Sequence, residues 1–307
     1  MTASKTPKNS PLFCPVAGDV SNRFRLSSTV VSLTLVWGAA PALFLSLVNR
    51  PGKARSDRQW RMSEPLPYDA PPTSPGSTAP LTAAATVILA RTAREPSDGK
   101  VEVLMLQRVG RGAFAGMWVF PGGKVDLEDR VAITDIELAS ELATARIAAA
   151  REAMEETGLA VAPLAMAPLS HWMPPPSETR RFSTWFFVAP APSGEIALAV
   201  DEATAHQWIT PEDALAANSR GELPLAPPTW MTLHHLSGSS SVDDLTGGLR
   251  LREPLRMHTR VVNREPLTLV WAGDVAYEHA DDAVDPTAGG PRHRLVMHSK
   301  GWSYERS

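Results

Sequence analysis

The sequence predicts an α/β (α+β) fold. Short apolar or aromatic runs typical of strands occupy residues 83–91, 101–108 and 181–188. Between the second and third of these runs lies an Ala- and Leu-rich stretch without Gly or Pro, a composition typical of helices. Because strand-like and helix-like segments alternate along the chain, we expect a sheet packed against helices.

The first half of this pattern predicts a hairpin, a loop and a helical region. Residues 83–91 and 101–108 are expected to pair across a polar turn that contains Asp98-Gly99. Pro121-Gly122-Gly123 is expected to end the apolar run before it, because proline and glycine interrupt strands. A capping-box pattern begins at Thr134, and one or two helices are expected from there to Gly158, the predicted C-cap.

The second half predicts shorter elements. Thr210 is expected to cap a helix that begins at Pro211 and ends at Ala217, and a further helix is expected at residues 228–236. Residues 237–248 are small and polar, so they are interpreted as a loop. Further β-like pieces follow at 206–209, 256–262, 267–271 and 294–306.

Residues 1–61 differ in composition from the rest of the chain. They hold nine Lys or Arg and two Asp, a net charge of +7, whereas the whole chain has a net charge of −3. The uncharged run at residues 26–49 is near the length that spans a bilayer, about 20 residues, but Gly38 and Pro41 interrupt it. We interpret residues 1–61 as a disordered leader or mis-assigned start in a cytoplasmic protein, with a membrane anchor as the alternative.

The remaining chain is expected to form a linker and one domain. Residues 62–81 are rich in proline and are interpreted as an extended linker. Residues 82–307 are the predicted domain, and residues 237–307 are expected to extend it, because about 70 residues are marginal alone. The net charge gives no case for a nucleic-acid partner. The single cysteine, Cys14, excludes an intramolecular disulfide and a cysteine-based zinc site.

The segment Arg151–Leu159 carries the clearest chemical signal. On a helix, Glu152, Glu155 and Glu156 share one face about 100° wide. Three carboxylates so placed repel one another, and a hard divalent cation bound through oxygen is the usual remedy. The alternative for an arbitrary pattern of this kind is a solvated acidic face. Arg151 lies at the edge of this face, where it can hold a carboxylate in place.

Together with Phe120-Pro-Gly-Gly123 upstream, this segment resembles the Nudix hydrolase family. The family's box reads Gly-x5-Glu-x7-Arg-Glu-U-x-Glu-Glu-x-Gly-U, where U is apolar. Its second half is matched by Arg151, Glu152, Ala153, Glu155, Glu156, Gly158 and Leu159, and its first position by Gly123. The resemblance implies an α/β/α sandwich with a mixed sheet. It also implies cleavage of a small-molecule diphosphate substrate with Mg²⁺ or Mn²⁺ as cofactor.

One departure from the box concerns its first half. The family has 13 residues between the first Gly and the Arg, whereas 27 separate Gly123 from Arg151 here. After the five intervening residues 124–128, the position of the family's glutamate is occupied by Asp129, and Asp126 and Glu128 are alternatives for it. The lengthened box, with its FPGGxVD opening, resembles a subgroup that includes peroxisomal coenzyme A diphosphatases and bacterial relatives. Coenzyme A specificity is therefore kept as the alternative.

The resemblance implies roles for further residues. Glu152, Glu155 and Glu156 are the expected metal ligands, Arg151 the residue that orients them, and Gly122, Gly123 and Gly158 the structural glycines. Glu202 and Glu152 are both candidates for the general base. Arg108 and Arg181 are candidates for contacts to substrate phosphates. Trp118, Trp172 or Trp185 is a candidate to stack on a nucleobase, with core packing as the alternative. A non-catalytic, nucleotide-sensing Nudix domain and a homodimer remain open.

Overall fold

The computed structural model describes residues 79–93, 100–110, 114–131, 141–278 and 289–307. The predicted leader at 1–61, its apolar run at 26–49, almost all of the linker, the Asp98-Gly99 turn and the capping box at Thr134 lie outside these residues. None of the helices within the described ranges has the length and apolar character that crossing a membrane requires.

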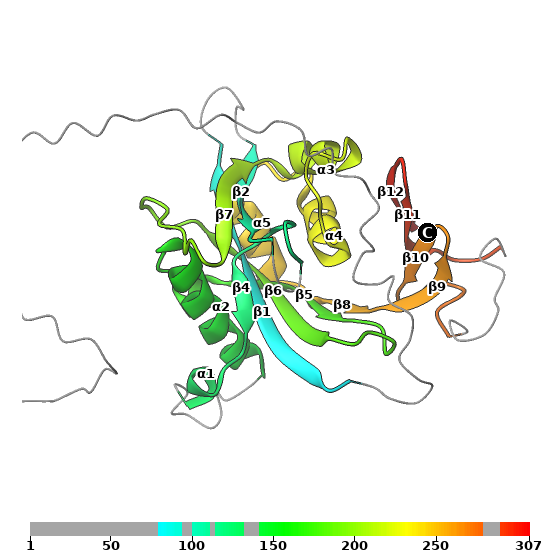
Figure 1. The fold of residues 1–307 in the computed structure, drawn as a ribbon, viewed down its shortest axis with the longest axis horizontal. Helices are drawn as coiled ribbons and strands as arrows, with labels where there is room; N and C mark the ends of the chain where they lie inside the picture. Colours follow the sequence, from blue (N-terminus) through cyan, green and yellow to red (C-terminus); the bar gives the residue numbers. More distant parts are fainter. Residues whose placement is uncertain (1–78, 94–99, 111–113, 132–140, 279–288) are drawn as a thin grey trace, which may run out of the picture. The chain divides into compact units, whose positions relative to one another are not determined.

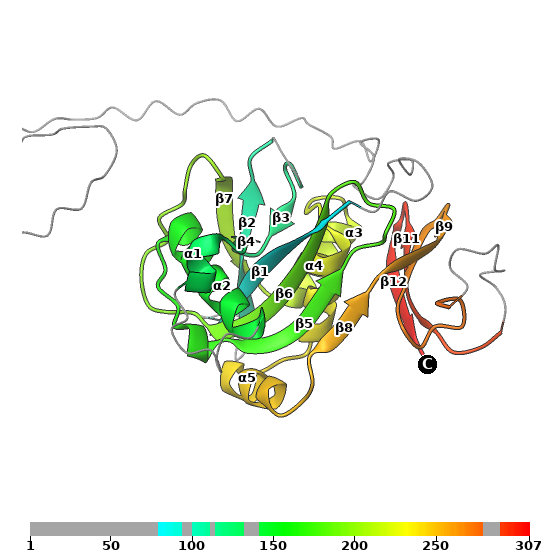
Figure 2. The same cartoon turned by 90° about the horizontal axis from the view of Figure 1, so that it is seen from below.

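The main sheet is mixed, and its strands follow the order β3-β2-β1-β6-β5-β8 (Figures 1 and 2). β4 pairs with β1, and β7 pairs with β2. The β1–β6 and β5–β8 pairs are parallel and the others antiparallel. The strands are β1 (Leu81–Thr92), β2 (Val101–Arg108), β3 (Trp118–Val119), β4 (Gly122–Lys124), β5 (Ala167–Met173), β6 (Arg181–Pro190), β7 (Ala203–Ile209) and β8 (Leu255–His258).

Helices cover both faces of this sheet. On one face lie α1 (Leu127–Val131) and α2 (Glu141–Thr157), followed by a 3₁₀ turn, η1 (Pro163–Ala165). On the other lie α3 (Pro211–Ser219), α4 (Pro227–Leu236) and α5 (Val242–Arg250). The fold is therefore the mixed α/β arrangement that the sequence predicted, with helices on both sides of a large mixed sheet.

A second sheet follows the main one. It is antiparallel, with the order β12-β11-β10-β9. Its strands are β9 (Arg260–Arg264), β10 (Leu267–Val270), β11 (His293–His298) and β12 (Gly301–Arg306). Since β8 belongs to the main sheet and β9 to the second, residues 237–307 contribute to both. We call β9–β12 the C-terminal sheet.

Several elements agree with the prediction. The β1–β2 hairpin pairs Ala90 with Val103. The Thr210 side chain accepts a hydrogen bond from the Asp213 N–H, and Pro211 begins α3, so the predicted cap is confirmed. Gly158 has φ of +72°, the left-handed conformation expected of a helix C-cap.

One prediction was wrong, and another needs an addition. Residues 237–248 were expected to be a loop, but α5 begins at Val242 and continues to Arg250. The Ser241 side chain caps it by accepting from the Asp244 N–H, and buried Val242 and Leu249 hold it on the core. The apolar run before Pro121 ends as predicted, since β3 stops at Val119, and Gly122–Lys124 then forms a separate short strand because pairing with β1 uses backbone groups alone.

Candidate active site

The glutamates lie on the second half of α2. The opposite face of this helix carries small residues, and Ala145, Ala148, Ala149 and Ala153 are buried against the sheet. The small side chains let the helix approach β1 closely, which brings its carboxylates near the strand that pairs with β1 at Ala84–Thr86. Gly158 then ends the helix two residues after Glu156.

Gly122 and Gly123 meet two of these glutamates directly. The Gly122 N–H donates to Glu156 Oε2 at 3.0 Å. A Cβ at Gly123 would overlap the carboxylate of Glu152, and a Cβ at Gly122 would overlap the backbone of Ala85 and Thr86. Gly122 therefore requires glycine because the backbone of β1 leaves no room for a side chain, whereas a side chain at position 123 would fit only if the Glu152 carboxylate moved.

Arg151 lies at the centre of a network of carboxylates. Its Nε and Nη2 donate to the two oxygens of Asp129 at 3.0 and 2.9 Å. Its Nη1 donates to Glu152 at 2.9 Å and to Glu155 at 3.0 Å, and its Nη2 also reaches the Lys124 carbonyl. Among the three acids that the sequence left open after Gly123, Asp129 is buried and makes this two-point contact.

The pKa values follow from this arrangement. Burial acts to raise the pKa of Asp129, but the hydrogen bond from Arg151 and the backbone N–H of Asp126 outweigh it, so the pKa is lowered. The hydrogen bond to Asp129 raises the pKa of Arg151, which is charged at every physiological pH. The Arg151–Asp129 pair is therefore a charged contact that fixes helix α1 against α2.

Glu156 has the opposite electrostatic surroundings. Burial raises the pKa of Glu156 to about 8, and the negative charges of Glu152 and Glu202 act in the same direction. The Gly122 N–H and the Arg108 guanidinium, whose Nη1 lies 3.8 Å from Oε1, oppose this shift without cancelling it. Burial also raises the pKa of Glu152. The cluster thus holds more negative charge than its neighbouring cations neutralise.

The donor set fits a hard divalent cation. Glu152, Glu155 and Glu156 present only carboxylate oxygens, the ligands that Mg²⁺ and Mn²⁺ prefer, and the excess negative charge favours a cation there. Within the ranges described above, no three acidic, histidine or cysteine side chains converge as a ready-made metal site. The reason is visible in the contacts: Glu152 and Glu155 both accept from Arg151, so a cation would compete with that guanidinium for their oxygens.

The structure also places Glu202 and Arg108 beside the cluster. The Glu202 carbonyl accepts from the Val109 N–H at 3.0 Å, which fixes the start of β7 against the end of β2. The Glu202 charge acts on both Glu152 and Glu156. Arg108 contacts Glu156 and also lines the adjoining cavity, so its guanidinium lies at the junction of the two.

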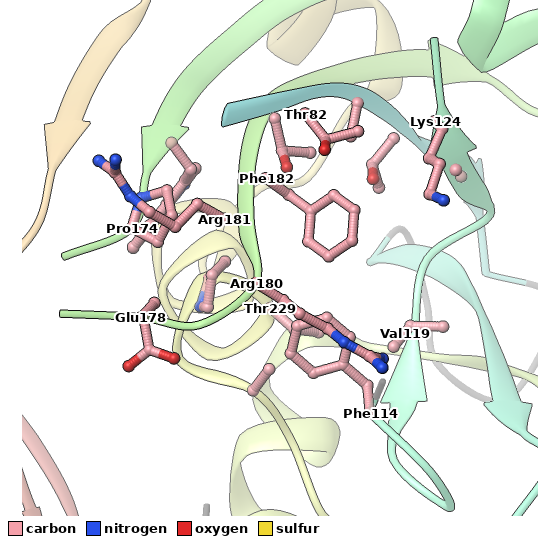
Figure 3. Close-up of a pocket in the computed structure, with 18 of the residues that line it drawn as sticks. Thr82, Phe114, Val119, Lys124, Pro174, Glu178, Arg180, Arg181, Phe182 and Thr229 are labelled. Atoms are coloured by element: carbon pink, nitrogen blue, oxygen red, sulfur yellow. The ribbon is translucent and has the colours of Figure 1, made fainter. Parts of the chain in front are cut away.

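A cavity of about 730 Å³ adjoins the glycine pair (Figure 3). Its walls come from β1, the loop before β3, β4, the start of β6 and the first turn of α4. The lining carries several aromatic and cationic side chains, which include Arg108, Phe114, Lys124, Trp172, Arg180, Arg181, Phe182 and Phe186. In Figure 3 the Arg180 side chain extends towards Val119 and Phe114, and the Phe182 ring lies between Thr82 and Arg180.

The aromatic candidates divide between cavity and core. Trp172 lines the cavity. Trp118 packs at the edge of the apolar core and is not among the residues that line the cavity, although its neighbour Val119 is. Trp185 stacks on His171 with ring centroids 4.5 Å apart, beneath α2. The core-packing alternative therefore describes the positions of Trp118 and Trp185.

Sequence reasoning missed Phe114 and Phe182 as cavity residues. Phe114 has φ of +60°, which is an uncommon conformation for a bulky residue, and no pattern in the sequence predicts this conformation. Phe182 lies in the aromatic run of β6, and its alternation with Thr184 and Phe186 was the available signal, since alternate residues of a strand face the same side. Arg181 lines the same cavity, and its Nη1 donates to the Ala79 carbonyl at 3.3 Å.

Comparisons with known proteins place these features in a family. Residues 80–227 match the family model of the NUDIX domain. No curated protein matches the sequence. Among solved structures, a NUDIX hydrolase from Alicyclobacillus acidocaldarius is 22% identical, with a TM-score of 0.48 over 56% of this chain and 97% of that chain.

Two further solved structures are similar at lower scores. The NUDIX domain of Shewanella oneidensis NrtR complexed with ADP ribose is 16% identical, with a TM-score of 0.37 over 53% of this chain and 90% of that chain. A C. elegans Ap4A hydrolase in a binary complex is 19% identical, with a TM-score of 0.35 over 51% and 96%. The family match covers every strand from β1 to β7, helix α2 and the glycine pair, so residues 80–227 are a domain of the NUDIX family.

Proposed function

We propose that this protein is a divalent-cation-dependent hydrolase that cleaves the diphosphate bond of a nucleoside diphosphate linked to another moiety. The NUDIX domain supports a pyrophosphatase-type hydrolase. The observation that carries the proposal is the carboxylate cluster of α2, which meets a cavity lined by cations and aromatic rings across Gly122 and Gly123.

The residues of the chain have distinct tasks in this proposal. Glu152, Glu155 and Glu156 hold the cation, and Arg151 positions Glu152 and Glu155 through its fixed pair with Asp129. A bound Mg²⁺ or Mn²⁺ ion supplies neutralisation of phosphate charge and a lower pKa for its water. Glu202 and Glu152 remain the two candidates to accept the proton of the attacking water.

Arg108 and the cavity bind the substrate. Arg108 lies beside Glu156 with a buried Nε that has no hydrogen-bond partner among the described residues, so it can donate to a phosphate oxygen. Phe114, Phe182 and Trp172 offer flat apolar surfaces for a base or another ring.

The test uses two isosteric variants. Glu155→Gln and Glu156→Gln keep the size of each side chain and remove its charge, so we expect each to abolish turnover while the circular dichroism spectrum stays unchanged. Wild-type protein is incubated with Mg²⁺ or Mn²⁺ and a panel of coenzyme A, ADP-ribose, NADH, dinucleoside polyphosphates and nucleoside triphosphates, with products identified by mass. Unchanged activity in both variants would exclude the proposed role of the cluster.

A coenzyme A or acyl-coenzyme A diphosphatase is the second candidate, and the arginines of the cavity favour it. Gly122 lies opposite Thr86 of β1 and Arg181 opposite Leu81, so five residues, about 17 Å, separate these ends along β1. A cation at that distance suits a substrate with an anionic group remote from its diphosphate, such as the 3′-phosphate of coenzyme A. A higher kcat/KM for coenzyme A than for dephospho-coenzyme A would support this candidate, and equal values would remove it.

A non-catalytic, nucleotide-sensing domain is the remaining alternative, and the contacts of Arg151 motivate it. Arg151 already occupies oxygens of Glu152 and Glu155, the carboxylates that a cation needs. Binding of ADP-ribose or coenzyme A in calorimetry without turnover of any panel member would support the sensing alternative.

A further inference from the structure

A cluster of histidines and a tyrosine lies where α4 meets the C-terminal sheet. We define the histidine–tyrosine cluster as His234 and His235 of α4, His293 of β11 and Tyr304 of β12. The Tyr304 ring centroid lies 5.1 Å from that of His234, 6.1 Å from that of His235 and 5.9 Å from that of His293. The three imidazoles therefore surround one tyrosine from two elements that are far apart in sequence.

Tryptophans extend this contact on both sides. Trp230 of α4 stacks on His234 at 5.4 Å between centroids and lies 6.1 Å from Trp302 of β12. On the C-terminal sheet side, Trp271 packs against His293 at 5.4 Å and against Tyr304 at 6.4 Å. Aromatic and imidazole rings thus form a continuous contact between the helix and the sheet.

Hydrogen bonds fix the proton on two of the imidazoles. His235 Nδ1 lies 2.7 Å from the Met231 carbonyl, and His293 Nδ1 lies 2.8 Å from the Ala272 carbonyl. Since a carbonyl oxygen only accepts, both Nδ1 atoms carry hydrogen, and in the neutral rings both Nε2 atoms are unprotonated. His293 Nε2 is buried and has no hydrogen-bond partner in the described part of the chain. A proton bound at His293 Nε2 would give the ring a positive charge, and the new N–H would have no hydrogen-bond acceptor among the described residues.

The charges around the cluster do not favour such a proton. Arg306 faces both His235 and His293, and the imidazoles of α4 and β11 face one another. The acid near His293 is Asp274, but both its oxygens accept from Arg294, at 2.6 and 2.7 Å. Burial lowers the pKa of His234, His235 and His293 alike. The neutral forms are therefore the ones that fit the folded arrangement.

The helix on which the C-terminal sheet rests is also a wall of the cavity. The residues that line the cavity from this side are Ala226, just before α4, and Pro228 and Thr229 in its first turn. Trp230 follows directly and contacts Trp302 of the C-terminal sheet. Because the residues that line the cavity and the residue that contacts the sheet are consecutive in α4, we expect a change in the docking of the sheet to alter the position of this cavity wall.

We propose that the docking of the C-terminal sheet on α4 is a pH-sensitive device. With His234, His235 and His293 neutral, the sheet is held against the helix. Acidification protonates these imidazoles. It places positive charge on His235 and His293 beside Arg306, with the buried Nε2 of His293 left unsatisfied, and adds the charge of the exposed His234 next to them. This repulsion releases the sheet and loosens the helical wall of the cavity.

The direction of the pH effect follows from the linkage between proton binding by the histidines and docking of the sheet. A histidine whose pKa is lowered by folding binds its proton more readily when the contact is open. The contact is fully stable above the ordinary histidine value near 6.5 and weakens progressively as the pH falls below it. Three linked sites make this dependence steeper than that of one histidine.

Hydrogen exchange measured on the full chain by mass spectrometry tests this proposal. After correction for the intrinsic rate, we expect protection of α4 and of β10–β12 to fall at least about tenfold between pH 7.5 and pH 5.5, while β1 and β6 keep theirs. Fluorescence of Trp230, Trp271 and Trp302 should change over the same range. Neither readout depends on the proposed enzymatic activity.

Variants assign the effect to the cluster. A triple variant with His234→Gln, His235→Gln and His293→Gln should lose the transition, and single variants at His235 and His293 should each shift its midpoint to lower pH. His298→Gln, at the exposed end of the same strand as His293, should behave as wild type. Constant protection in wild type down to pH 5, or an unaltered transition in the single variants, would overturn the proposal.

Discussion

Arg151 and Asp129 form a two-point ion pair that joins α2 to the short helix α1, with Nε to Oδ1 at 3.0 Å and Nη2 to Oδ2 at 2.9 Å. Asp129→Asn removes the negative charge and leaves the guanidinium with weaker partners on that side. Because Arg151 keeps its contacts to Glu152 and Glu155, we expect the free energy of unfolding to fall by about 2 kcal/mol, less than for an isolated buried pair. Urea unfolding at pH 7.5 measures this loss.

The control for this change is Asp126→Asn. Asp126 lies 3.6 Å from the same guanidinium, but its side chain is 56% exposed. Such contacts contribute little, so we expect a change below about 0.5 kcal/mol. Equal losses in the two variants would show that the two-point geometry is not the source of the stability.

The Arg151–Asp129 pair also shows which features of the site could be predicted from the sequence. The spacing of Glu152, Glu155 and Glu156 and the C-cap at Gly158 are local, period-dependent features, and the structure has them where the pattern put them. The partner of Arg151 depends on how residues 125–131 pack against α2. Three acids in this segment, Asp126, Glu128 and Asp129, lie at nearly the spacing that the family's box requires. Burial selects Asp129, and burial is a tertiary property.

The wrong prediction of a loop at residues 237–248 has the same origin. Gly247 and Gly248 lower helix propensity within α5, but packing of Leu249 and the Ser241 cap override it. Part of the cavity was likewise beyond the sequence, because Phe114 and Phe182 reach it from segments that are separated by almost 70 residues. Local patterns therefore predicted the α2 glutamates and three residues of the cavity lining, Arg108, Trp172 and Arg181, but not these two aromatic residues.

The glycine pair yields a matched comparison. Gly122→Ala places a methyl group against the backbone of Ala85 and Thr86, which cannot move without disturbing β1. Gly123→Ala meets only the carboxylate of Glu152, which can rotate away. We expect the first variant to lose about 2 kcal/mol of stability and the second less than about 1 kcal/mol. Thermal and urea unfolding of both proteins would measure the difference.

Although Gly123→Ala is the variant expected to lose less stability, its activity is expected to fall. Gly123→Ala displaces a proposed metal ligand, so we expect kcat to fall at least about tenfold at full folding. A Gly123→Ala protein with wild-type kcat would argue against a catalytic role for the position of Glu152.

Glu156 gives the site a defined pH dependence of stability. Burial raises the pKa of Glu156 from the ordinary value of 4.5 to about 8, so its protonated form favours folding. This contribution is fully present below pH 4.5 and is lost as the pH rises through 8. In EDTA, we expect wild type to lose on the order of 2 kcal/mol from this group between pH 5 and pH 9.

Glu156→Gln should lack that loss. Its amide oxygen still accepts from the Gly122 N–H, and no charge is buried, so the variant should be more stable than wild type at pH 9 although inactive. Added Mn²⁺ should raise the melting temperature of wild type and not that of the variant. A parallel pH dependence of the two proteins in EDTA would place the titrating group elsewhere.

Arg108 and Arg181 are both expected to serve the substrate, and their contacts separate them. The Nε of each is unpartnered among the described residues, but Arg108 lies 3.8 Å from Glu156, whereas Arg181 donates through Nη1 to the Ala79 carbonyl at the other end of the cavity. We expect Arg108→Gln to lower kcat/KM by about 10- to 100-fold, because a charge-assisted phosphate contact of about 1.5–3 kcal/mol is lost. Arg181→Gln should raise KM with kcat nearly unchanged, because Arg181 is remote from the carboxylates. Steady-state kinetics of both variants on the preferred substrate tests this assignment. A larger loss of kcat/KM in Arg181→Gln than in Arg108→Gln would indicate that the scissile diphosphate binds at the Arg181 end of the cavity.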